Sequence, residues 1–95
     1  MSSMRSLNEV HKAESEFFDK VWFYRHQQTA EKVKSGQLKI EEDIWKGALK
    51  AAQEVIKKYG KDNVDPYSDY ELGMLEGKLS ALRWVLGDVW DMLDT

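Results

Sequence analysis

Two histidines, His11 and His26, are the side chains best suited to acid–base or metal chemistry in this chain of 95 residues. They belong to one predicted helix and lie about 22 Å apart along its axis, so they cannot share a metal ion. His11 and Glu14 form an i, i+3 pair, which ferritin-like proteins use only with several further inward carboxylates. The other acidic residues are expected on outer helix faces or in loops. We therefore predict no metal site and no cofactor.

Nucleophilic catalysis finds little support in the residue types. The chain has no cysteine, and a serine nucleophile needs an adjacent histidine. Ser68 is better explained as a helix cap and Ser80 as a small packing residue. Gly73 and Gly77 lie inside a predicted helix rather than in a phosphate-binding loop. We therefore do not expect an enzyme.

One group of side chains is suited to a small ligand. Trp22, Arg25 and His26 share the first predicted helix, and Trp84 and Trp90 could approach them from the last one. Aromatic walls together with an arginine favour a planar or anionic molecule. The same side chains would also suit the aromatic core and polar rim of a protein interface. Both interpretations stay open.

The first helix is predicted from the signals at its two ends. Ser6 and Glu9 match a capping box, and Gly36 is a typical residue just past a helix end, which predicts a helix over 6–35. Thirty residues make this helix roughly 45 Å long. We expect residues 1–5, which precede it, to be disordered.

Two shorter helices are predicted after the first. One covers 41–59 and stops at Gly60. Residues 61–67 are expected to form a loop, and a last helix covers 68–93, with Gly87 as a candidate earlier stop. These segments predict a single all-α domain over 1–95, a three-helix, bundle-like protomer with a long first helix.

The composition limits the partners that we expect. Of all residues, 33% are charged and 42% are hydrophobic, and the net charge is −3. Residues 61–95 hold eight acidic and three basic side chains, so a basic face for nucleic acid is missing. An apolar run long enough for a membrane helix is also missing. The first residues lack the apolar core of a signal peptide, which favours the cytoplasm.

Small residues on the two shorter helices predict a close helix contact. A leucine seam of period 3.5 on the last helix predicts its core side. Its opposite side carries Gly73, Gly77 and Ala81, although glycine inside a helix costs up to about 1 kcal/mol relative to alanine. Gly47 and Ala51 give the middle helix a matching stripe. We predict that these two helices pack antiparallel through the five small residues.

The first helix carries apolar side chains most of the way round its circumference. Between residues 17 and 24, six of eight side chains are apolar, whereas a helix in a lone bundle buries one face. Large exposed apolar patches are rare on monomers. We therefore predict a homodimer with an interface formed by Phe17, Phe18, Val21, Trp22 and Tyr24.

The chain resembles a group of small uncharacterised bacterial proteins. The resemblance is carried by Gly73, Gly77 and the ending KLSALRWVLGDVWDMLDT, and also by the segments around Trp22 to His26 and around Trp45. It implies a bacterial setting and brings no activity or ligand with it. The main functional expectation is a homo-oligomeric interaction or structural module. The alternative is a small-molecule binding protein that uses the aromatic, arginine and histidine residues of the first helix.

Overall fold

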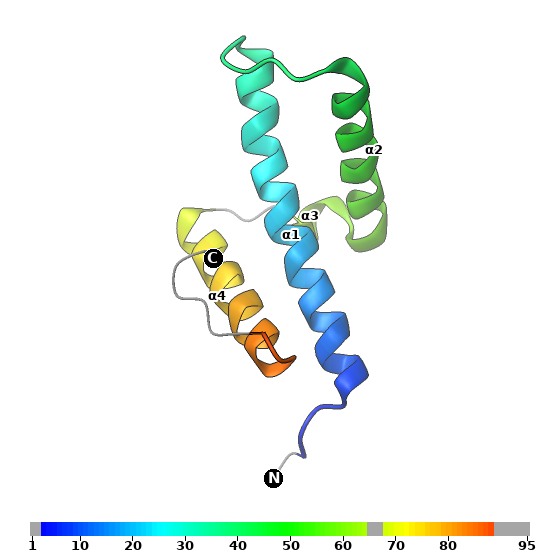
Figure 1. Cartoon of the computed structure of the whole chain (residues 1–95), viewed down its shortest axis with the longest axis vertical. Coiled ribbons are helices and arrows are strands. Elements are labelled where there is room, and N and C mark those ends of the chain that lie inside the picture. The colour runs from blue at the N-terminus through cyan, green and yellow to red at the C-terminus, as the bar shows by residue number, and fades with distance from the viewer. Residues whose placement is uncertain (1–2, 65–67, 89–95) are drawn as a thin grey trace.

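The chain folds into four helices in the computed structural model, which describes residues 3–64 and 68–88 (Figure 1). They are α1 (Leu7–Lys34), α2 (Glu42–Tyr59), α3 (Lys61–Val64) and α4 (Asp69–Val85). No strand occurs within the described ranges, which confirms the predicted all-α class. The helices predicted over 6–35 and 41–59 agree with α1 and α2 to within one residue at each end.

Both ends of α1 form as their residue types predict. The Ser6 hydroxyl accepts from the Glu9 backbone N–H at 3.2 Å, and the Glu9 carboxylate accepts from the Ser6 N–H at 3.1 Å. After Lys34 the chain turns at Gly36, with φ at +83°. The Gln37 N–H donates to the Lys32 carbonyl at 2.9 Å, which completes a Schellman motif. The long first helix is therefore capped at both ends.

The prediction of a loop throughout 61–67 is wrong in its first half, where the chain forms the short helix α3. Gly60, with φ at +86°, ends α2 and redirects the chain. The Asn63 side-chain amide then donates to the Tyr59 carbonyl at 2.8 Å and secures the turn. Val64 is only 1% exposed. Its buried side chain holds this segment against the core. Residues 65–67 lie outside the described ranges.

The last helix ends earlier than predicted. α4 stops at Val85, and Gly87 has a φ of +112°, which is incompatible with a continuing right-handed helix. The N–H of Asp88 donates to the Arg83 carbonyl at 2.9 Å, and that of Gly87 donates to the Trp84 carbonyl at 3.1 Å. This second Schellman motif makes Gly87 a helix stop. The prediction that one helix runs to residue 93 is therefore wrong, and residues 89–95 lie outside the described ranges.

α1 is the central helix, with α2 and α4 on opposite sides of it (Figure 1). Cross-helix pairs show that α4 runs antiparallel to α1, because Glu14 contacts Arg83 while Arg25 contacts Glu76. The aromatic pair His26–Trp45 and the hydrogen bond from Tyr59 to Asp19 show the same for α2. The main core cluster consists of Phe23, Ala52 and Val64, with Trp22, Val55, Ile56 and Tyr59 packed against it.

The predicted close contact between the two shorter helices is not formed within the protomer. Among the described residues, α2 and α4 each contact α1 and do not contact each other. All five predicted contact residues are exposed, namely Gly47, Ala51, Gly73, Gly77 and Ala81. A Cβ added at any of the three glycines would meet no described atom within 4 Å. The physical reason is that α1 lies between α2 and α4, so the small residues of these two helices cannot meet.

The central position of α1 explains its apolar circumference without a second copy. Val21 and Phe23 are both buried inside the protomer. They point about 160° apart around the helix, because two residues in sequence correspond to about 200° of rotation. Two helices of the same chain thus cover two faces of α1. The premise that only one face is covered was wrong, while the oligomeric state itself stays a prediction. None of the described helices is both long and apolar enough to cross a membrane.

Candidate functional site

Two ion pairs connect α1 to α4. The Arg25 guanidinium donates to the Glu76 carboxylate at 2.7 Å, and the Arg83 guanidinium donates to that of Glu14 at 3.2 Å. Glu14 and Arg25 are separated by about three turns of α1, so the pairs hold α4 at two distant points. Because all four side chains are partly exposed, each pair contributes little stability. Their main effect is to fix which face of α4 turns toward α1.

Aromatic contacts reinforce the same orientation. The Lys78 ammonium lies 5.8 Å from the ring centroid of Phe17, and the Arg83 guanidinium lies 5.4 Å from that of Phe18. Both distances are within the range of cation–π attraction. The Tyr24 hydroxyl donates to the Asp69 carboxylate at 3.0 Å. Lys78, Arg83 and Asp69 are thereby drawn toward α1.

The opposite side of α4 is an apolar surface without charge, which we call the α4 outer face. It includes Tyr70 at 75% exposed, Met74 at 45% and Val85 at 60%. All members of the face are exposed and uncharged: Tyr70, Gly73, Met74, Gly77, Ala81, Trp84 and Val85. At 100° per residue they cluster about 180° away from the side of Leu72, Leu79 and Arg83. This arrangement is the main candidate functional site.

The sequence signal for this face was only partly read. Gly73, Gly77 and Ala81 are the small residues opposite the leucine seam, and the predicted contact of these residues with α2 is not formed within the protomer. Tyr70, Met74 and Val85 belong to the same stripe, since they follow at spacings of three or four residues. A helical-wheel analysis of the apolar residues as well as the small ones would have found the complete face.

The predicted dimer-interface residues of α1 are largely engaged inside the protomer. Val21 is buried, Phe17 lies beneath Lys78, and Tyr24 binds Asp69. Trp22 is partly buried and packs against the core cluster. Phe18 is the most exposed of the five, with Arg83 lying over its ring. The protomer leaves little of this predicted interface available to a second copy.

The predicted ligand-binding group is divided between two helix contacts. On the α2 side, His26 stacks between Trp22 and Trp45, with ring centroids 5.1 Å apart in each pair. Arg25 instead reaches Glu76 on the α4 side. Trp84 lies on the α4 outer face, and Trp90 lies outside the described ranges. The side chains therefore do not form one site within the described structure. Trp45 is a member of this cluster that the sequence does not predict, because nothing local to its helix indicates which residue of α1 it meets.

The stacked histidine has an altered proton affinity. Burial among aromatic rings lowers the pKa of His26, because desolvation disfavours the charged imidazolium. Phe23 also lies near the imidazole, with a centroid distance of 6.5 Å. His26 is therefore a neutral packing residue between α1 and α2. His11 is exposed near the other end of the helix.

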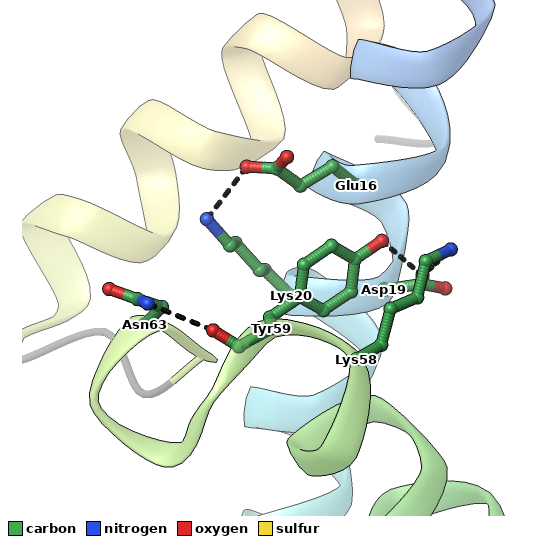
Figure 2. A network of polar contacts seen from close by, with 6 residues as sticks. All are labelled: Glu16, Asp19, Lys20, Lys58, Tyr59 and Asn63. Atoms are coloured by element: carbon green, nitrogen blue, oxygen red, sulfur yellow. Dashed lines mark hydrogen bonds and ion pairs between the residues drawn. The ribbon is translucent and has the colours of Figure 1, made fainter.

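A polar network joins the end of α2 to α1 (Figure 2). The Tyr59 hydroxyl donates to the Asp19 carboxylate at 2.7 Å, and the Lys58 ammonium lies 3.8 Å from the same oxygen. Lys20 pairs with Glu16 at 2.9 Å one turn away. Burial raises the pKa of Tyr59, and the hydrogen bond to Asp19 and the negative charges of Asp19 and Glu16 raise it further. The phenol therefore stays a neutral donor that fixes the position of α2.

An open depression of about 450 Å³ lies beside this network. It is lined by five side chains, Asp19, Glu54, Val55, Lys57 and Lys58. Its charged groups have mixed signs, and a structural hydrogen bond already occupies Asp19. Within residues 3–64 and 68–88, no group of three or more histidine or acidic residues could hold a metal ion. The depression gives no specific indication of chemistry.

Comparison with known proteins does not assign the chain to a family. No protein-family model matches it, and no curated protein or solved structure matches it either. The resemblance of its ending to small bacterial proteins stays a prediction.

Proposed function

We propose that the protein is a homo-oligomeric interaction module and that the α4 outer face is its interface. The observation that carries this proposal is the exposure of seven uncharged residues on one side of a 17-residue helix. In a chain with 33% charged residues, an exposed helix side without charge is unusual. Contiguous exposed apolar surface of this kind is typical of interaction sites.

The position of the face also favours this function. The ion pairs of Glu76 and Arg83 with α1 lie on the opposite side of α4, and Lys78, at the edge of the outer face, reaches across to Phe17. A partner could therefore dock on the outer face without disturbing the protomer. The α1 aromatic residues are less suited to a partner, because separating them from α2 or α4 would expose the core. A cytoplasmic, bacterial setting is part of this proposal.

The small-molecule alternative has weaker support. Trp22, His26 and Trp45 already stack on one another, and inserting a planar ligand would require these rings to separate. Arg25 is paired with Glu76 and faces another helix. The α4 outer face itself lacks the convergent polar groups that orient a small ligand.

The proposed function is tested by measuring mass as a function of concentration. We expect sedimentation equilibrium to show the 11.1 kDa chain moving toward a dimer in the micromolar range. Met74→Glu places a charge on the face and should raise the dissociation constant at least about tenfold, because burying an unpaired charge is costly. The matched control is Leu49→Glu on α2, where the leucine is 42% exposed; it should leave association unchanged. A wild-type chain that stays monomeric up to millimolar concentration would contradict the proposal.

A further inference from the structure

Five of the seven residues of the α4 outer face are arranged as a palindrome of side-chain size around Gly77. Gly73 and Ala81 lie four residues before and after it, and Tyr70 and Trp84 lie seven residues before and after it. The face thus has small residues at its middle and an aromatic ring at each end, about 10 Å along the axis from Gly77. Met74 and Val85 lie on the same face outside this pattern, because the positions that mirror them around Gly77 are Ser80 and Asp69.

A pattern of this kind is self-complementary in an antiparallel pair. When two identical helices cross with a two-fold axis at one residue, each position before the axis meets the equivalent position after it. Small residue then meets small residue, and Tyr70 of one copy meets Trp84 of the other. In a parallel pair every position meets itself, and a palindrome would have no effect. The observed order therefore favours the antiparallel arrangement.

The glycines permit the close approach that such a crossing needs. A Cβ added at Gly73 or Gly77 would meet no described atom within 4 Å, so neither glycine is required by the packing of the protomer. Helices packed through small residues bring their axes to about 8 Å. Antiparallel alignment also places the positive end of each helix dipole beside the negative end of the other.

The available area is sufficient for a weak but specific dimer. Each large aromatic side chain can bury about 150–250 Å², and Tyr70 and Trp84 are 75% and 55% exposed. With Met74, Val85 and the small residues of both copies, the buried surface is on the order of 1,000 Å², at the lower limit of specific interfaces. Lys78 does not oppose the contact, because its ammonium leans toward Phe17 on α1.

We infer that the partner of the α4 outer face is a second copy of this chain, bound antiparallel with the two-fold axis at Gly77. This inference rests on the proposed function and adds to it the antiparallel orientation and the register of the two copies. It makes the outer face an isologous interface, in which the same surface serves both copies. It also leaves the ion pairs between α1 and α4 intact in each protomer.

Cysteine cross-linking tests the register directly, because the chain contains no cysteine. A disulfide needs Cα atoms about 4.4–6.8 Å apart. Under mild oxidation Gly77→Cys should give a covalent dimer. Gly73→Cys alone and Ala81→Cys alone should not, whereas an equal mixture of these two variants should cross-link. Ala51→Cys on α2 is the matched control at an exposed alanine, and it should stay uncross-linked. Circular dichroism of each variant checks that the helices are retained.

The outcomes separate the inference from the proposed function. Self-cross-linking of both Gly73→Cys and Ala81→Cys, without the mixed product, would show a parallel dimer and overturn the inference while leaving self-association in place. A wild-type monomer at all concentrations would overturn both. If the chain dimerises only after truncation at Asp88, residues 89–95 occupy the face in the intact chain, and the second copy is not the natural occupant.

Discussion

The imidazole of His26 in α1 stacks on the indole of Trp45 in α2, with ring centroids 5.1 Å apart and planes inclined by 22°. Trp22 covers the other face of the imidazole at the same centroid distance. A titratable group thus forms part of an otherwise aromatic helix contact. The contact between α1 and α2 should therefore depend on pH.

We expect the free energy of unfolding to fall as the pH is lowered through 6.5. Burial lowers the pKa of His26 from its ordinary value of 6.5, so the unfolded chain binds a proton at a pH where the folded chain does not. The stabilisation from neutral His26 is complete above pH 6.5 and is lost as the pH falls from 6.5 to the lower pKa of His26 in the folded chain. Its size is about 1.4 kcal/mol for each unit by which the two pKa values differ. Urea unfolding between pH 7.5 and 5.5 measures it. His26→Phe should remove this dependence and the exposed His11→Gln should keep it; an unchanged slope in His26→Phe would refute the assignment.

Replacing Tyr59 by phenylalanine should destabilise the fold by about 1–2 kcal/mol. The substitution removes the donor that binds the Asp19 carboxylate at 2.7 Å, and hydrogen bonds to charged groups contribute more than neutral ones. Thermal unfolding at low protein concentration measures the change. Tyr70→Phe, at a site 75% exposed, is the control and should stay within about 0.5 kcal/mol of the wild type. Equal effects of the two substitutions would show that the network in Figure 2 has no special role.

Replacement by alanine should have opposite effects on the stability of the protomer at Gly77, inside α4, and at Gly87, just after its end. At Gly77, Ala improves helix propensity and meets no described atom, so the protomer should gain up to about 1 kcal/mol. The added methyl group should at the same time weaken dimerisation. At Gly87, with φ at +112°, the same substitution should destabilise by about 1–2 kcal/mol. Chemical unfolding and sedimentation give the two quantities separately. A Gly77→Ala variant that dimerises more tightly would contradict the proposed close approach.

Truncating Val64 should destabilise the protein by about 2 kcal/mol. Its side chain is 1% exposed and packs against Phe23 and Ala52, so Val64→Ala removes buried apolar surface and leaves a small cavity. Val85→Ala, which truncates the same residue type at a site 60% exposed, is the matched control and should have little effect on the protomer. A similar loss in both variants would show that α3 is not anchored through its valine.

The helix ends were the most predictable features of this fold. Ser6 with Glu9, Gly36 and Gly60 each act on backbone groups within a few residues, so their effect can be read from local sequence. Gly87 is a local signal for a helix end, whereas the longer leucine repeat predicts a helix that continues past it. The positive φ of that glycine shows that the local signal prevailed.

The relations between helices could not be predicted in the same way. The apolar circumference of α1 is equally compatible with a second copy and with two helices of its own chain. Trp45, for example, meets His26 through a contact between residues 19 positions apart. Contacts of this kind depend on the order in which helices are placed around α1. Residue type and spacing within one helix carry no information about that order.

The absence of contact between α4 and α2 among the described residues has a consequence for how the chain opens. Since α4 is joined to the remaining described helices through α1 alone, it can detach while Phe23, Ala52 and Val64 stay packed. Amide protons of α4 should then exchange with solvent through a sub-global opening that is less costly than complete unfolding. Self-association through the outer face would oppose this opening and protect the α4 amides from exchange.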